Sequence, residues 1–224
     1  MNNFKALVNQ YKDIFFYTIL QQQLNGCASV LDVGCGSDSP IQYLKKTFHC
    51  EGIDIHKRSI KVSQKRNIHS NYRIGNILNI DKYYKRSSFD AVIALDVIEH
   101  LQKAEGLQLI NKMEKIAKNK IVILTPNGVT QQHPYDDNPH QKHKSGWIKK
   151  DFELLKYRVY GLRSFKFIRG GHADITLKPW LFWGFIAFIT EPLLYFFPSL
   201  SFDLFAVKIL KISDTLNEKN KLEI

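Results

Sequence analysis

An acidic residue and two glycines follow an apolar segment in the first part of the chain. The segment ends at Asp32, and Gly34 and Gly36 come next at alternate positions. Glycine lets the backbone turn sharply and approach a ligand closely. Ser39 and Pro40 then favour the start of a helix, whose first N–H groups have no partner inside the helix. A strand, a glycine turn and a helix N-terminus in this order predict a cradle for a nucleotide-type ligand.

A second acid ends the next apolar segment. Residues 51–55 are predicted to form a strand that carries Asp54, 22 positions after Asp32. In a doubly wound sheet this carboxylate lies beside the first glycine turn, where it can accept hydrogen bonds from both hydroxyls of a ribose.

Histidines gather in a polar loop that follows a later apolar strand. The strand ends in a turn at 125–128, and the loop 138–147 contains His140 and His143. Histidine can take a proton from a hydroxyl near neutral pH. The alternative for each one is a loop histidine that faces solvent. The pair could also suggest a metal site, but no third ligand follows at a convincing spacing, so the sequence predicts no metal. The general-base candidates, in order, are His143, His140, His100 and His133.

Alternating strands and helices must position these residues. The alternation predicts a parallel sheet covered on both faces, and apolar residues at helical spacing predict an N-terminal helix over 4–23. Strands are expected near 28–33, 50–54, 70–74, 89–95, 119–125, 158–167 and 202–209, and helices near 40–47, 58–66, 103–117 and 151–157.

Together these segments resemble the class I S-adenosylmethionine (SAM) dependent methyltransferases. The acid-x-Gly-x-Gly run at 32–36 is similar to the first motif of that family, and residues 88–101 are similar to its fourth strand and cofactor-facing acidic segment. The resemblance covers roughly residues 27 to 165. It implies a Rossmann-like α/β fold, a doubly wound seven-stranded sheet of order 3-2-1-4-5-7-6 whose last strand is antiparallel.

The resemblance also implies SAM as the cofactor and a set of residues that bind it. Two positions depart from the family pattern: Asp38 replaces a third glycine, and Asn76 replaces an acid that often contacts adenine. Asp32 has an alternative role as a buried carboxylate that organises its own turn. The implied residues are Asp32, Gly34, Cys35 and Gly36 toward the methionine end, Asp54 and Ile55 at the ribose, Asn76 and Ile77 at the adenine, and Asp96 beside the sulfonium.

An aromatic insertion, 170–201, separates the last two strands. Its apolar runs, 180–189 and 193–197, are each shorter than the about 20 residues that span a bilayer. Thr190 to Pro192 interrupt them. We predict two short helices bent at Pro192 that anchor the protein to one membrane face through 178–198. The alternative is a lid or an interface that buries the same surface against protein.

Composition is that of one globular domain with room for an extra element. The chain has 224 residues, 44% of them hydrophobic and 24% charged. We divide it into an N-terminal helix (1–26), the methyltransferase-like domain (27–212) and a polar tail (213–224). Its three cysteines lack CxxC spacing, which argues against a disulfide framework or a zinc site and favours a reducing compartment. We expect a cytoplasmic protein, peripheral on the cytoplasmic membrane face if the insertion binds lipid.

The leading interpretation is O-methylation of a saccharide, glycolipid or lipid-like acceptor at a membrane surface, in cell-envelope glycan or lipid synthesis. It follows from the resemblance of the histidine loop to those of small-molecule, saccharide and quinone-precursor methyltransferases, and from the insertion. The net charge of +11 points to a polyanion, an anionic membrane or simply solvated helix faces. Two alternatives stay open: an RNA methyltransferase, and a SAM-binding scaffold without catalysis. The sequence leaves the oligomeric state open.

Overall fold

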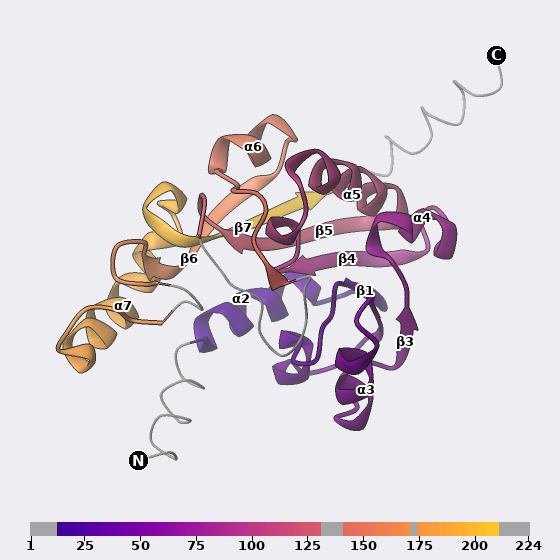
Figure 1. The fold of residues 1–224 in the computed structure, drawn as a ribbon, viewed down its shortest axis with the longest axis horizontal. Coiled ribbons are helices and arrows are strands. Elements are labelled where there is room, and N and C mark those ends of the chain that lie inside the picture. Colours follow the sequence, from indigo (N-terminus) through magenta and orange to yellow (C-terminus); the bar gives the residue numbers. More distant parts are fainter. Residues whose placement is uncertain (1–12, 131–140, 171–173, 211–224) are drawn as a thin grey trace.

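A seven-stranded sheet of order β3-β2-β1-β4-β5-β7-β6 forms the centre of the molecule (Figure 1). The computed structural model describes residues 13–130, 141–170 and 174–210. β7 is antiparallel to both neighbours, and the pairs from β3 to β5 are parallel. The predicted fold class is therefore confirmed. The strands are β1 (Ser29–Val33), β2 (His49–Asp54), β3 (Asn71–Ile74), β4 (Phe89–Leu95), β5 (Ala117–Pro126), β6 (Arg158–Phe165) and β7 (Ser201–Ile209).

Three of the four helices predicted between strands lie close to their expected positions. The expected helix over 40–47 is wrong, because only one 3-10 turn forms, Pro40–Tyr43. Ser39 caps this turn, but Leu44 is already extended. The residues that follow, 45–47, are polar and exposed, so nothing apolar holds a further turn against the sheet. The helices are α2 (Ile14–Leu24), α3 (Lys57–Lys65), α4 (Ile80–Tyr83), α5 (Lys103–Ile116), α6 (Lys149–Leu154) and α7 (Trp180–Leu194).

Alternate residues of the central strands face two separate cores. In β4, Val92 and Ala94 pack in the core that includes α5, whereas Ile93 and Leu95 pack in the core that includes α2. Helices therefore cover both faces of the sheet, as the alternation predicts. Trp147 is fully buried in the first core. The start of the expected N-terminal helix and the tail 213–224 lie outside the described residues.

In its described residues the insertion forms one α-helix and then a 3-10 turn, Pro198–Leu200, where two helices bent at Pro192 were predicted. α7 continues through Pro192, which lies in the last turn, where its missing N–H removes only one backbone hydrogen bond. Glu191 is buried, and its Oε1 accepts a hydrogen bond from the Arg163 backbone N–H at 2.6 Å. The acid that interrupts the apolar run in the sequence thus fastens α7 to β6. Among the helices of the described ranges, none is long and apolar enough to cross a membrane.

Candidate cofactor and acceptor site

One cavity opens at the carboxyl ends of β1, β2 and β4, where ligands bind in doubly wound sheets. Most of the predicted cofactor residues meet there although they come from separate strands. Further lining residues, which were not predicted individually, are Leu78, Val97, Leu101, Glu105, Gln141 and Lys144. The predicted residues in the lining are Gly34, Gly36, Asp54, Ile55, Asn76, Ile77 and Asp96, with His100 beside them.

The glycine turn and Asp54 form one hydrogen-bonded unit. Gly34 and Gly36 both have a positive φ, 73° and 57°, which other residues adopt at a cost. A Cβ on Gly34 would lie 2.8 Å from the Val97 side chain. The Gly36 N–H donates to Asp54 Oδ2 at 2.9 Å, and the His56 N–H donates to Oδ1 at 2.7 Å. The turn therefore holds the carboxylate in place at the cavity wall.

Burial raises the pKa of Asp54 above its usual value, although the two backbone N–H groups oppose this shift. Each carboxylate oxygen has a further lone pair that can accept a hydrogen bond. Asn76 is placed similarly at the cavity wall, but its side-chain oxygen already caps a 3-10 turn by accepting from the Leu78 N–H at 2.9 Å. Only its second lone pair is left for an adenine amino group.

Asp32 and Cys35 do not line the cavity, in contrast to the other predicted cofactor residues. Asp32 is 2% exposed, and its Oδ2 accepts a hydrogen bond from Ser39 Oγ at 2.5 Å and bonds His69 Nε2 at 2.8 Å. These contacts support the alternative role, a buried carboxylate that organises the turn. Cys35 is buried against Gly52, because its backbone N–H joins the turn and its side chain points into the fold.

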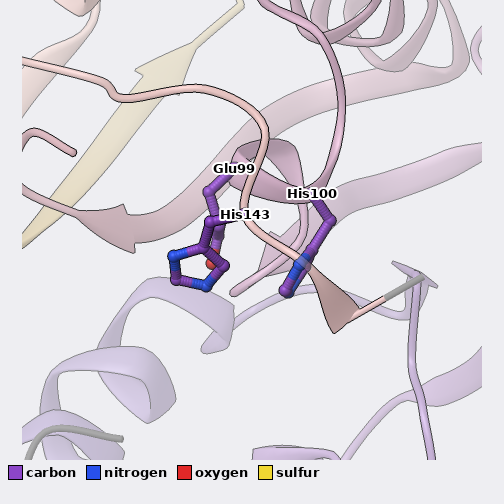
Figure 2. A group of neighbouring side chains, drawn as sticks. All are labelled: Glu99, His100 and His143. Atoms are coloured by element: carbon purple, nitrogen blue, oxygen red, sulfur yellow. The ribbon is translucent and has the colours of Figure 1, made fainter. Parts of the chain in front are cut away.

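His100, in the cavity wall, forms a cluster with Glu99 and His143, which lie behind it (Figure 2). Each residue contributes one potential ligand atom, and these atoms lie within 4.8 Å of one another. The two imidazole rings meet edge to face, with centroids 4.9 Å apart. No sequence spacing joins these residues, since Glu99 and His100 follow β4 whereas His143 follows β5. His140 and His133 lie outside the described residues.

Hydrogen bonds fix the cluster. The Lys144 backbone N–H donates to the Glu99 backbone carbonyl at 2.7 Å, so the histidine loop is tied to the turn after β4. The Glu99 carboxylate is 2% exposed and accepts a hydrogen bond from Thr125 Oγ1 at 2.9 Å. His143 Nδ1 lies 2.8 Å from the Thr130 backbone oxygen, which can only accept. Nδ1 therefore carries the proton, and Nε2 of the neutral ring has the lone pair.

A half-buried arginine holds the acid at the entrance of the cavity. Arg163 reaches from β6 to Asp203 at 2.7 Å, and lies 3.5 Å from both Asp96 and Asp13. Asp96 has a φ of 56°, a region that aspartate tolerates better than most residues. Arg163 carries no signal in the sequence, because the residues that it joins are distant along the chain.

Acid should destabilise the protein through His100. Burial, with a smaller effect of His143, lowers the His100 pKa from 6.5 to about 4. Below pH 6.5 the unfolded histidine binds a proton that the folded one does not, so its contribution to stability is complete above pH 6.5 and is lost as the pH falls to about 4. Over this pH range we expect the free energy of unfolding of wild type to fall by up to about 3 kcal/mol more than that of His100→Asn. Urea unfolding across the range measures the difference, and equal losses would contradict the prediction.

The comparisons with known proteins agree with this geometry. Residues 31–125 match the sequence profile of a family described as "Methyltransferase domain". Over these residues the chain is similar to a methyltransferase domain. Ajmaline N-methyltransferase of Rauvolfia serpentina is 30% identical over 104 residues, which cover 43% of this chain and 34% of that enzyme. The matched region thus spans about a third of this curated relative.

Solved structures share the fold of the methyltransferase domain. A SAM-dependent methyltransferase from Archaeoglobus fulgidus aligns with a TM-score of 0.55 and 19% identity, over 90% of this chain and 98% of that one. The N-terminal domain of EvdMO1, determined in the presence of SAH and D-fucose, aligns with a TM-score of 0.56 and 12% identity, over 87% and 81% of the two chains. At these identities the likeness extends to the fold only.

Proposed function

We propose that the protein transfers the methyl group of SAM to a hydroxyl oxygen of a saccharide, glycolipid or lipid-like acceptor at a membrane surface. One observation carries the proposal: a single cavity joins the glycine turn and Asp54 to His100, whose ring contacts that of His143. A nucleoside cradle therefore lies beside groups that can handle a proton.

The residues of the cavity fit a SAM molecule. The glycine turn allows close approach because a Cβ on Gly36 would meet open space, and the Asp54 carboxylate can accept hydrogen bonds from ribose hydroxyls. Asn76 and Ile77 would border the adenine, and Asp96 the sulfonium. When bound, SAM supplies a methyl group activated by the positive charge of its sulfur.

His143 has the tautomer that a general base needs. Its Nδ1–H is engaged by the Thr130 carbonyl, so the Nε2 lone pair can take the proton of an acceptor hydroxyl. The acceptor oxygen keeps the electron pair of the broken O–H bond and becomes the nucleophile. His100 stays neutral because of its lowered pKa, so it adds no positive charge that would repel the proton arriving on His143.

Three observations support an acceptor that combines hydroxyl groups with a lipid. The acceptor side of the cavity is polar and includes Glu105, Gln141 and Lys144, side chains that can bind sugar hydroxyls. A structural neighbour, the N-terminal domain of EvdMO1, was determined in the presence of D-fucose. The apolar surface of α7 supports the lipid part.

α7 exposes apolar side chains along most of its length. It lies beside β6, the outermost strand of its edge (Figure 1). Exposed Lys178 lies just before it, and aromatic side chains near basic ones are typical of helices at a membrane interface. The exposed apolar residues of α7 and the turn after it are Trp180, Leu181, Phe182, Phe185, Phe188, Ile189, Leu193, Phe196, Phe197 and Leu200.

Removing two of these rings should weaken membrane binding. Phe185 and Phe188 are 62% and 67% exposed, so their replacement leaves the protein core intact. We expect Phe185→Ser/Phe188→Ser to lower partitioning into vesicles that contain anionic lipid by about 10- to 100-fold. Leu154→Ser removes an apolar side chain that is 74% exposed on α6 and serves as the matched control. Equal sedimentation of all three proteins with vesicles would count against the membrane surface.

A label-transfer experiment tests the proposed function. The purified protein is incubated with methyl-labelled SAM and a lysate of its source organism, and lipid, saccharide, RNA and protein fractions are separated. Label in lipid or membrane saccharide supports the proposal. Label in RNA would support the nucleic-acid alternative, to which the positive charge also points. SAM binding with no label in any fraction would favour the scaffold.

A further inference from the structure

We propose that Glu99, His100 and His143 bind a divalent first-row transition metal ion. Imidazole nitrogens and a carboxylate are ligands for Mn²⁺, Fe²⁺, Co²⁺ and Zn²⁺, and two histidines with one carboxylate leave coordination positions open. The three potential ligand atoms lie within 4.8 Å of one another. Donors held about 2.0–2.2 Å from one ion lie closer together than this, so small side-chain rotations would complete the site.

His100 presents a nitrogen that the described part of the protein does not use. Its Nδ1 is buried and has no hydrogen-bond partner among the described residues. The ring does form a hydrogen bond with the Lys142 backbone. Since Nδ1 has no partner, this bond uses Nε2–H, and Nδ1 of the neutral ring keeps its lone pair. A buried lone pair without a partner is costly, and a metal ion would satisfy it.

The hydrogen-bond partners that orient the three candidate ligands are of the kinds found around metal ions in proteins. A histidine that binds metal commonly donates its second N–H to a backbone carbonyl, which sets the tautomer and the ring orientation. Both histidines do so here: His143 to Thr130 and His100 to Lys142. The Glu99 carboxylate is likewise held, because Oε2 accepts a hydrogen bond from the Thr125 hydroxyl and Oε1 is left for a ligand. Packing of the two rings against each other would not by itself require hydrogen bonds that orient all three side chains, whereas a metal site would.

The position of the site suggests its use. His100 lines the cofactor cavity, so an ion at the cluster would lie beside the reacting groups. A hydroxyl bound to that ion would release its proton to water more readily, and the oxygen would keep the electron pair. His143 would then act as a ligand and not as the base. This role rests on the proposed function, whereas metal binding itself does not.

Titration of the full-length protein with Co²⁺ tests the site. We expect one ion per chain, visible d–d absorption bands, and binding at least about 10-fold weaker in Glu99→Gln, His100→Ala and His143→Ala. Glu99→Gln keeps the shape of the side chain, and circular dichroism with thermal unfolding verifies the fold of each variant. His49→Ala, an exposed histidine outside the cluster, should bind Co²⁺ as wild type does. No binding by wild type, or equal binding by the cluster variants, would overturn the proposal.

The label-transfer assay separates this inference from the proposed function. Co²⁺ binding that depends on the cluster, without methyl transfer to any fraction, would keep the metal site and overturn the proposed function. Methyl transfer that a chelator leaves unchanged, together with no Co²⁺ binding, would overturn the metal site and keep His143 as the base.

Discussion

Replacing His143 with alanine is expected to lower the rate of methyl transfer at saturating SAM by about 10²- to 10⁴-fold. The Thr130 carbonyl engages Nδ1–H of the imidazole, so Nε2 keeps the lone pair that takes the hydroxyl proton, and alanine offers no such group. The rate of label incorporation into the accepting fraction measures the effect.

SAM affinity should not change in this variant, because His143 does not line the cofactor cavity. Calorimetric titration with SAM therefore serves as the internal control, and His49→Ala controls for the loss of a histidine elsewhere. A variant that turns over at the wild-type rate would show that another group removes the proton. Weakened SAM binding would instead indicate that His143 supports the cavity.

Replacing Asp54 with asparagine is expected to raise the dissociation constant of SAM by about 100-fold or more. Two hydrogen bonds between a charged carboxylate and ribose hydroxyls contribute about 1.5–3 kcal/mol each, and about 1.4 kcal/mol corresponds to a factor of ten. The substitution also points an amide N–H₂ group at the backbone N–H of Gly36 or His56, which loosens the glycine turn.

Asp38→Asn is the matched control for Asp54→Asn. Asp38 lies in the same loop but is exposed and pairs with Arg66 at 2.8 Å, outside the cavity lining. Asp38→Asn removes the same charge as Asp54→Asn but does not alter the ribose position. This variant should therefore bind SAM with nearly the affinity of wild type. Equal affinities of the two variants would refute the assignment of Asp54. Thermal unfolding separates a loss of affinity from a loss of fold.

The sequence determined the sheet and one half of the site by itself. Apolar segments that end in an acid or a glycine turn mark the carboxyl ends of parallel strands, and all such ends meet at one edge of the sheet. This local rule is enough to bring Gly34, Asp54 and Asp96 to one cavity from their positions along the chain alone. The positions of the central strands were also predictable from the sequence, because buried parallel strands are short and continuously apolar.

The tertiary structure alone decided the contacts between residues that are distant along the chain. Asp32 turned inward because His69, from the segment before β3, meets its carboxylate. Glu191 became an anchor because the backbone of Arg163 in β6 reaches it, and α7 therefore stays one helix. The cluster of Glu99, His100 and His143 required two loops to be tied together by backbone hydrogen bonds. A sequence pattern records periodicity and neighbours along the chain, whereas these contacts depend on how the loops fold back over the sheet.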